Sequence, residues 1–386
     1  MEPVKLKEGI YWVGGIDWKL RNFHGYSTGR GSTYNAYLII DEKITLIDTV
    51  KEYLYDEMIE RISKIADPAK IDVIVSNHVE MDHSGSLPKI MQVCPGAQIY
   101  ASPNGVRGLK AHYRKAWNFK EVKEGDSLSL GKRSLSFLLT PMVHWPDNMV
   151  SYCPEEKILF SNDSFGQHIA SSERFDDEYP VDIIREEAAK YYANIVWPYS
   201  AQVRKELEAA SALDFEMIAP SHGLVIRSHV NEIVSQYQKW ADLEMIKKAV
   251  VVYDTMWKST EKMAVSIASA FEATGYKVRL MSLQENHISD IMTELLDARI
   301  LCVGSPTLNN NMLPTVAAFL TYLKGLSPGG RNALAFGSYG WGGQSVALME
   351  NELETAGFTL IDGFKIKYIP DGDQLRHIKE DLEKRI

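Results

Sequence analysis

The spacing of apolar residues changes along the chain near residue 247. Up to about residue 170 short strand-like runs dominate, and YNAYLIIDEKITLIDTV predicts a hairpin that turns at DEK. A more helical stretch covers roughly 181–213, before FEMIAPSHG returns to a strand followed by a loop. We therefore expect a first domain of short strands and a few helices.

The second part of the chain alternates nearly all-apolar strands with helices. Its expected strands include AVVVYD, YKVRLMSL, ARILCVG and NALAFG, and helices are expected between them. Strands that are apolar on both faces and alternate with helices indicate a parallel sheet covered by helices. We place the boundary after the helical run QYQKWADLEMIKK, which gives domains 1–247 and 248–386.

Composition narrows the class of protein. The 386 residues are 45% hydrophobic and 24% charged, as in an ordinary globular protein, and the net charge of −9 argues against a nucleic-acid surface. No apolar run approaches the ~18 residues that cross a bilayer, and charges occupy the place of a signal peptide's apolar region. Cys94, Cys153 and Cys302 form no CxxC pair, so we expect reduced thiols in a cytoplasmic protein.

The segment HVEMDH places four possible metal ligands in six positions directly after the apolar run IDVIVSN. Alone it also fits a solvated polar loop. Three further ligands follow expected strands, however, so the chain offers four imidazoles and three carboxylates at strand ends. Such a set is enough for two metal ions with mixed nitrogen and oxygen ligands and one bridging carboxylate. The candidate ligands are His78, Glu80, Asp82, His83, His144, Asp163 and His222.

Asp48 and four further histidines are expected to have structural roles rather than to bind metal. Asp48, at the end of LIDTV, is expected to accept hydrogen bonds from backbone donors rather than to bind metal. The histidines interpreted as surface or hydrogen-bonded residues are His112, His229, His287 and His377.

Three loops of the second half have features of a phosphate and ring site. YDTMWKSTEKMA lacks G-x-G-x-x-G and G-x-x-x-x-G-K-[ST], which excludes dinucleotide and Walker-type sites. Its hydroxyl groups lie beside an expected helix N-terminus, which favours a phosphate. GSPTLNNNMLP and GSYGWGGQS follow later strands, at the sheet edge where ligands of open parallel sheets bind. Each loop alone also fits a turn that caps a helix.

H-x-E-x-D-H followed by distant His, Asp and His resembles the metallo-β-lactamase fold family. Glu80, where its hydrolases usually carry His, makes the chain resemble the flavodiiron proteins, also called A-type flavoproteins. The resemblance implies an N-terminal αββα sandwich followed by a flavodoxin-like doubly wound parallel sheet. It also implies one iron held by His78, Glu80 and His144, and a second held by Asp82, His83 and His222, with Asp163 bridging.

The first loop of the second half resembles the flavodoxin phosphate loop and departs from it at Lys258, where many flavodoxins have glycine. Three such loops in flavodoxin order favour FMN. The candidate FMN contacts are Thr255, Met256, Trp257, Lys258, Ser259 and Thr260, then Ser305, Pro306, Thr307 and Asn309, and finally Ser338, Tyr339, Gly340, Trp341 and Gly342. His24, His168 and Tyr192 match segments that line the gas pocket in relatives; ordinary structural hydrogen bonds are the alternative.

The resemblance implies an oxidoreductase that reduces dioxygen to water or nitric oxide to nitrous oxide and protects an anaerobic cell; we expect turnover with dioxygen. It also implies a head-to-tail homodimer, or a dimer of dimers, in which the flavin of one subunit faces the diiron site of the other. The electron donor is either a separate rubredoxin or a reduced deazaflavin coenzyme. The alternatives are a zinc-dependent hydrolase with an accessory flavodoxin-like domain and a flavin-binding module on a metal-free scaffold.

Overall fold

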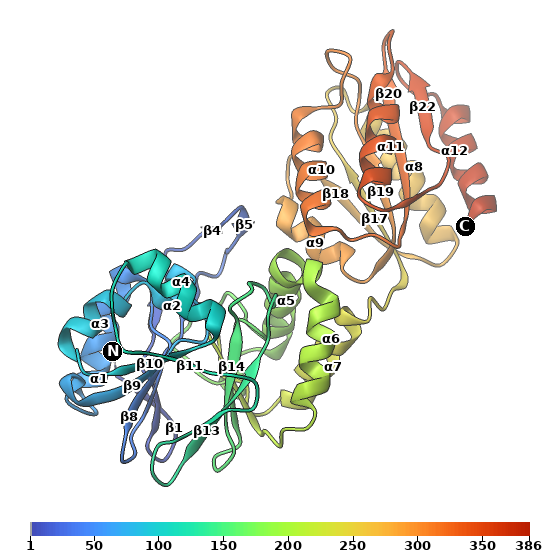
Figure 1. Ribbon diagram of the computed structural model, residues 1–386. Helices are drawn as coiled ribbons and strands as arrows, with labels where there is room; N and C mark the ends of the chain where they lie inside the picture. Colours follow the sequence, from blue (N-terminus) through green and yellow to red (C-terminus); the bar gives the residue numbers. More distant parts are fainter. Residues whose placement is uncertain (1) are drawn as a thin grey trace. The chain divides into compact units, whose positions relative to one another are not determined.

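The computed structural model describes residues 2–386 and divides into two compact units (Figure 1). The first unit comprises the chain up to His24, Thr28–Tyr191 and Tyr199–Ala241. The second comprises Gly25–Ser27, Tyr192–Pro198 and Asp242–Ile386, so two short early segments group with the later part of the chain. No helix within the described residues combines the length and apolarity that a bilayer crossing requires.

One sheet of the first unit has seven strands, mixed in direction. Their order is β1 (Val4–Lys7), β2 (Ile10–Trp12), β7 (Tyr37–Ile39), β8 (Ile44–Ile47), β9 (Ile71–Val75), β10 (Gln98–Ala101) and β11 (Phe119–Glu121). β7 and β8 pair antiparallel, which confirms the predicted hairpin. β8 to β11 then run parallel, because helices return the chain between them.

The second sheet of this unit has five strands. They are β12 (Ser127–Ser129), β13 (Ser134–Leu139), β14 (Met149–Cys153), β15 (Ile158–Asn162) and β16 (Met217–Pro220), in that order. β12 to β15 are antiparallel neighbours, whereas β16 pairs parallel with β15. The carboxyl ends of β13, β15 and β16 therefore lie at one edge of the sheet, and the chain leaves each of them toward the same region.

The two sheets pack face to face and helices cover their outer faces (Figure 1). Trp12, Ile47 and Val75 of the first sheet meet Phe137 and Phe160 of the second in one apolar core. The helices of the first sheet are α1 (Tyr55–Ser63), α3 (Leu87–Val93) and α4 (Pro103–Tyr113), and their buried residues form a separate core with it. α5 (Val181–Tyr191), α6 (Ser200–Ala210) and α7 (Val230–Ala241) complete the expected αββα sandwich.

The second unit contains a parallel sheet in the flavodoxin order. Its strands are β18 (Lys277–Ser282), β17 (Ile246–Tyr253), β19 (Ala298–Gly304), β20 (Asn332–Tyr339) and then β21 (Thr359–Leu360) and β22 (Phe364–Lys367), both beside β20. All pairs are parallel. The strand order reverses between β17 and β19, the position at which such sheets bind ligands.

Helices cover both faces of this sheet, as the sequence predicts. α8 (Ser259–Ala273) and α12 (Gly372–Arg385) pack on one face, with α9 (Ile288–Leu295), α10 (Pro314–Leu326) and α11 (Gln344–Thr355) on the other. The helical interpretation of QYQKWADLEMIKK is wrong at its end, because α7 stops at Ala241 and Ile246 already begins β17. The run IKKAVVVY carries β-branched residues that favour the strand.

Candidate metal centre and flavin loops

The HVEMDH segment lies where β9 ends and a short helix begins. Glu80 precedes α2 (Met81–Ser84), which carries Asp82 and His83. His78, Asp82 and His83 are almost completely buried. His144 lies in the loop between β13 and β14, and the remaining ligands follow β15 and β16. The parallel register that pairs Asn162 with Pro220 sets Asp163 beside the loop that carries His222.

One group of candidate ligands gathers around Oδ2 of Asp163. The Nε2 atom of His78 lies 3.4 Å from Oε2 of Glu80 and 3.6 Å from Oδ2 of Asp163. The Nε2 atom of His144 lies 3.6 Å and 3.4 Å from the same two oxygens. Ligands that each lie about 2.0–2.2 Å from one ion are separated by roughly 3–3.6 Å. These four side chains therefore have the spacing of one metal site.

A second group gathers around Oδ1 of Asp163. The Nε2 atom of His83 lies 3.1 Å from this oxygen and 3.3 Å from Oδ1 of Asp82. The Nε2 atom of His222 lies 3.3 Å from it and 3.5 Å from Oδ2 of Asp82. Each oxygen of Asp163 thus faces a different group, which is the arrangement of a carboxylate that bridges two ions.

The buried ligand atoms lack other partners among the described residues. Nε2 of His78, Nε2 of His83, both carboxylate oxygens of Asp82 and Oδ2 of Asp163 are buried without a hydrogen-bond partner. Burial would raise the pKa of Asp163, but the surrounding imidazoles of His83, His144 and His222 hold that pKa well below its ordinary value. Buried anions and unpaired acceptors are costly unless cations neutralise them, so the residues fit two bound metal ions.

Outer hydrogen bonds orient two of the imidazoles. Nδ1 of His78 lies 2.9 Å from Oδ2 of Asp147, which also accepts a hydrogen bond from the Val79 backbone N–H. Nδ1 of His222 lies 2.8 Å from the carbonyl oxygen of Thr33. Such partners hold the proton on Nδ1 and leave Nε2 free to face a metal. No motif in the sequence singles out Asp147, which lies three residues after His144.

Asp48 has the structural role predicted from the sequence. It is buried and accepts hydrogen bonds from the backbone N–H of Asn77 at 2.8 Å, from the Asn77 side chain at 3.0 Å and from the Asn162 side chain at 3.4 Å. Asn162 in turn accepts a hydrogen bond from Asn148 at 3.1 Å. This network connects the three loops that carry His78, His144 and Asp163.

Replacing Asp48 by alanine is expected to loosen all three loops together. Loss of the acceptor leaves the buried donors of Asn77 and Asn162 unpaired, at about 2–4 kcal/mol of unfolding free energy. Denaturant unfolding followed by metal analysis of Asp48→Ala measures both effects, and Asp72→Ala, at a more exposed carboxylate, serves as control. A loss below about 0.5 kcal/mol with full metal content would contradict the role of the network.

The residues proposed for the gas pocket lie in different surroundings. Nε2 of His24 is 3.4 Å from Oε1 of Glu80, the oxygen turned away from the metal group, and its side chain is 74% exposed. His168 is buried, with Nδ1 2.7 Å from Oγ of Ser32 and its ring 5.0 Å from that of His222, and burial holds its pKa well below the ordinary value. Tyr192 begins the π-helix η4 (Tyr192–Val196), which groups with the second unit.

Tyr191, the neighbour of Tyr192, lies beside the rings of His168 and His222. The ring of Tyr191, at the end of α5, lies 5.2 Å from the His168 ring and 5.9 Å from the His222 ring. No sequence motif distinguishes Tyr191 from Tyr192, because two adjacent tyrosines differ only in their angular position on the helix.

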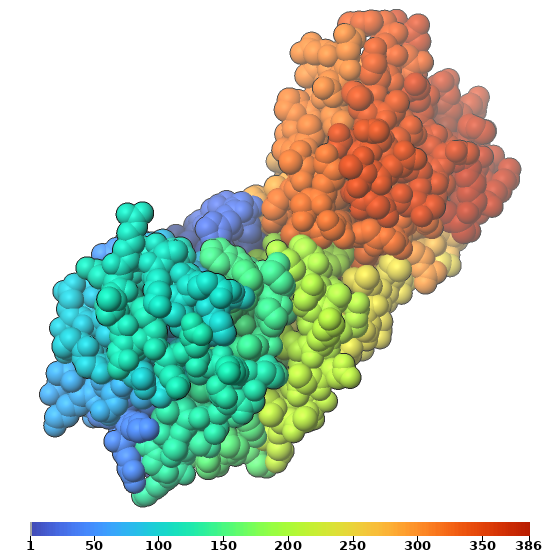
Figure 2. Space-filling model, viewed as in Figure 1, coloured from blue at the N-terminus to red at the C-terminus, as the bar shows by residue number. Residues whose placement is uncertain are grey.

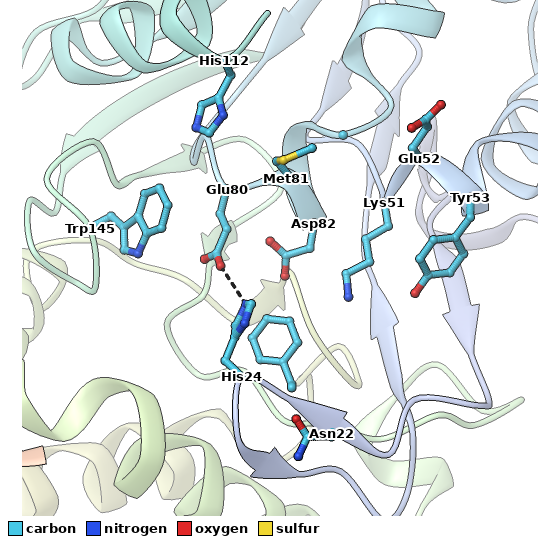
Figure 3. Close-up of a pocket in the computed structure, with 12 residues that line it drawn as sticks. Asn22, His24, Lys51, Glu52, Tyr53, Glu80, Met81, Asp82, His112 and Trp145 are labelled. Carbon is cyan, nitrogen blue, oxygen red and sulfur yellow. Dashed lines mark ion pairs between the residues drawn. The ribbon is translucent and has the colours of Figure 1, made fainter. Parts of the chain in front are cut away.

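A pocket of about 610 Å³ opens beside Glu80 and Asp82 (Figure 3). Lys51 faces it, with its ammonium group 4.5 Å from the ring centre of Tyr34, and burial lowers the pKa of this lysine. Trp145 and His112 line the pocket on the other side of Glu80. His112 is exposed, as predicted for a surface residue, and it lines the open pocket as well, while His229 and His287 form the expected hydrogen bonds, with Asp176 and Ser289.

The first flavin loop has the backbone that a phosphate loop requires. Lys258 adopts a φ of +64°, the left-handed conformation that glycine reaches without strain, and so takes the place of the glycine of many flavodoxins. Ser259 and Thr260 open α8, where backbone N–H groups are free for an anion. Oγ1 of Thr255 is buried without a hydrogen-bond partner among the described residues. These features fit a bound phosphate.

The other two loops form a small pocket with exposed aromatic residues beside them. It has a volume of about 230 Å³ and is lined by Thr307, Asn309, Asn310, Gly340, Trp341 and Gly342. Trp341 is 92% exposed and Trp257, in the first loop, is 86% exposed. Large exposed apolar rings next to a pocket mark a binding surface. Ser305 has a different place, because it is buried and its Oγ accepts a hydrogen bond from the Leu313 backbone.

Comparisons with known proteins agree with this geometry. Residues 33–223 match the family model "ODP family beta lactamase" and residues 251–381 match "Flavodoxin". The chain is 46% identical to a nitric oxide reductase of Moorella thermoacetica, over 98% of this chain and 97% of the relative. Among solved structures, the rubredoxin oxygen:oxidoreductase of Desulfovibrio gigas has a TM-score of 0.96 at 42% identity, covering 99% of this chain and 97% of that one.

A second solved structure shows the same agreement. The flavodiiron protein of Giardia intestinalis has a TM-score of 0.97 at 36% identity, covering 100% of this chain and 97% of that one. The resemblance seen in H-x-E-x-D-H thus extends over the whole chain, and this chain belongs to the flavodiiron proteins.

Proposed function

We propose that this protein is a flavin- and diiron-dependent reductase of a diatomic gas, which converts dioxygen to water or nitric oxide to nitrous oxide and so protects an anaerobic cell. The observation that carries the proposal is the pair of ligand groups that share Asp163, one at each carboxylate oxygen. The names of two relatives, nitric oxide reductase and rubredoxin-oxygen oxidoreductase, support both gases as substrates.

Iron suits the ligand set better than zinc. All seven candidate ligands offer imidazole nitrogen or carboxylate oxygen, and no thiolate competes. Glu80 adds a negative charge to the first group, where a hydrolase of this fold would place a neutral imidazole. A harder, more anionic site favours a metal that must be stable in both the ferrous and the ferric state. His78, Glu80 and His144 would hold one iron, Asp82, His83 and His222 the other, with Asp163 bridging.

Bound FMN and iron would supply the electrons and the open coordination positions for gas reduction. The side chains near them position the gas and supply protons. His24 contacts the outer oxygen of Glu80, and Lys51 places an ammonium group at the pocket wall near Asp82. Both groups donate hydrogen bonds toward a ligand in the pocket. The rings of Tyr191 and His168 lie beside the ring of His222.

FMN is the flavin that the loops of the second unit fit. Its phosphate would bind at the N-terminus of α8 with Thr255, Ser259 and Thr260, and its ring would lie between Trp257, Trp341 and the pocket beside Asn309. Thr255→Val removes a buried hydroxyl group without changing side-chain volume. We expect it to weaken FMN binding about 10- to 100-fold, because a hydrogen bond to a charged group is worth about 1.5–3 kcal/mol.

Fluorescence titration of the flavin-free protein with FMN measures this loss, and metal analysis reports on the first unit in the same sample. Thr274→Val, at the far end of α8, is the matched control. Equal FMN affinity in Thr255→Val and in the parent protein would place the phosphate elsewhere.

The flavin reaches the metal centre of a second copy in this proposal. The pocket beside Glu80 opens to solvent next to Tyr53 and Met81, which are 63% and 57% exposed, as expected of a surface that another copy covers. The assembly is a head-to-tail homodimer or a dimer of dimers in the cytoplasm. Either a separate rubredoxin or a reduced deazaflavin coenzyme supplies the electrons.

A visible spectrum combined with metal analysis of the purified protein tests the proposal. Bound flavin with about two irons per chain supports a gas reductase. Colourless protein with zinc would indicate the hydrolase, and flavin without metal would indicate a binding module. Electrode assays with dioxygen and with nitric oxide on one preparation then identify the preferred gas.

A further inference from the structure

An aspartate and two tyrosines lie together near the second group of candidate ligands, and none of the three has a role in the proposed function so far. β3 (Gly15–Asp17) and β6 (Ser32–Tyr34) form a two-stranded antiparallel sheet in which Tyr34 pairs with Gly15. Paired residues share a face of such a sheet, and so do residues two positions apart on one strand. The side chains of Asp17 and Tyr34 therefore lie on the same face, with only a glycine opposite Tyr34.

Tyr53 joins this pair from the 3₁₀ helix η1 (Glu52–Leu54). Its hydroxyl group donates a hydrogen bond to Oδ2 of Asp17. The early part of the chain, coloured blue, reaches the surface in Figure 2, and Tyr53 is 63% exposed although its hydroxyl group is turned toward Asp17. Asp17 is itself partly exposed. Solvent therefore reaches this end of the group.

Tyr34 is the buried end of the group. Its side chain is completely buried, and its ring lies edge-on 5.4 Å from the ring of His222. The ammonium group of Lys51, which faces the pocket, lies 4.5 Å from the ring centre of Tyr34 and 6.0 Å from that of Tyr53. Lys51 thus connects the two tyrosines with the pocket beside Glu80.

The hydroxyl group of Tyr34 lacks a hydrogen-bond partner among the described residues. Burial raises the pKa of this hydroxyl group most, and interactions with Asp82, Tyr53 and Asp17 raise it further. The hydroxyl group therefore lies within electrostatic reach of a candidate metal ligand and of the Asp17–Tyr53 pair. A tyrosine with a purely structural role would have its buried hydroxyl group paired within the fold, so this group fits an ordered water as its partner.

We propose that Asp17, Tyr53 and Tyr34, with one bridging water, form the route by which protons enter the pocket. The inference rests on the proposed function, which consumes a proton with every electron. Each step is balanced, because every group gives one proton and regains one. Lys51 gives a proton to the reduced gas and regains one from Tyr34. Tyr34 regains its proton from the water, the water from Tyr53, Tyr53 from Asp17, and Asp17 from solvent.

A separate route is needed because the flavin of a second copy covers the pocket in the proposed assembly. A covered pocket excludes bulk water, so protons must enter through side chains and single ordered waters. Lys51 and His24 each hold one exchangeable proton for the gas and must be recharged for every further proton that the reaction consumes. Asp17 provides the contact with solvent, beside the pocket rather than at its opening.

Conservative variants test the route, with dithionite as the electron source. Tyr34→Phe and Tyr53→Phe each remove a hydroxyl group and keep the ring, and Asp17→Asn keeps an acceptor for Tyr53 but takes up no proton. We expect each variant to lower dioxygen consumption about tenfold, because general acids contribute at least this much. The ratio of rates in normal and heavy water should rise, and more hydrogen peroxide should escape per dioxygen, since two-electron reduction needs fewer protons.

The combination of variants and a matched control make the result specific. Tyr34→Phe/Tyr53→Phe should lose no more activity than the worse single variant, because both hydroxyl groups act in one route. Tyr55→Phe, at a partly buried tyrosine two residues beyond Tyr53, should stay at the parental rate. Metal content, FMN content and the visible spectrum should be parental in all variants. If Tyr34→Phe loses metal, Tyr53→Phe and Asp17→Asn, at more exposed side chains, decide the outcome.

A crystal structure of the parent protein gives a reading that does not depend on activity. It should show an ordered water between the hydroxyl groups of Tyr34 and Tyr53, and a Tyr34 hydroxyl group without a neighbouring water would overturn the route. Parental heavy-water ratios and parental peroxide release in Tyr53→Phe and Asp17→Asn would overturn it as well. Failure of the parent protein to consume gas with dithionite would refute the proposed function instead.

Discussion

Asp163→Ala is expected to lower gas consumption by more than about 100-fold and to remove metal from both sites. One carboxylate oxygen lies 3.4–3.6 Å from His78 and His144, and the other lies 3.1–3.3 Å from His83 and His222. No other described carboxylate faces both groups. Losing it deprives each ion of a ligand and leaves two positive charges close together without the shared anion, which raises the energy of the filled site.

Metal analysis, an oxygen electrode and flavin absorbance measure the metal content, the gas consumption and the FMN content of one preparation. FMN content should stay at the parental level, because Asp163 belongs to the first unit and the flavin loops to the second. Asp182→Ala, at a well exposed carboxylate, controls for a general effect of removing an acidic residue. Asp163→Ala with two bound metals and parental turnover would eliminate the proposed centre.

Mixing two inactive variants is expected to restore activity if the flavin acts across subunits. The first partner is Asp163→Ala, which keeps flavin but lacks the metal centre. The second is Thr255→Asp/Ser259→Asp, in which added carboxylates repel the phosphate of FMN while the metal centre stays intact. A mixed head-to-tail dimer contains one complete site, so random re-pairing should recover about a quarter of parental activity per subunit.

The recovery depends on exchange of subunits, which supplies the control. Mixing without a dissociation step, or cross-linking each variant first, should give no recovery. If flavin and metal worked within one chain, no mixture would regain activity, whatever the extent of exchange. A parent protein that remained monomeric at assay concentration and still turned over would contradict the trans arrangement as well.

Local patterns predicted the architecture well, because secondary structure depends mainly on short-range periodicity. The hairpin around DEK, the parallel sheet of the second half and the helices between its strands are all confirmed. The error at DLEMIKK arises from a competition between local propensity and long-range pairing. Leu243, Glu244 and Met245 are good helix formers, yet IKKAVVVY pairs with β18 and β19, and this long-range pairing outweighs local propensity.

The candidate ligands could be found from the sequence because each follows an apolar strand and has an imidazole or carboxylate group that can bind metal. What only the structure showed is how they are divided. Asp163 lies between two groups because the parallel register of β15 and β16 places it there. Lys51, His112 and Trp145 had no motif to reveal them, and they line one pocket only because loops from both sheets meet at its rim.

The sequence by itself determined the kind of elements, their order and the chemical identity of the ligands, since these depend on residue type and short-range spacing. The tertiary structure alone decided which oxygen of Asp163 faces which histidines, that Asp48 connects three loops, and that Lys258 adopts the left-handed conformation of a glycine. Those features depend on strand register and loop closure between residues that are far apart in the chain, and residue patterns do not encode such distances locally.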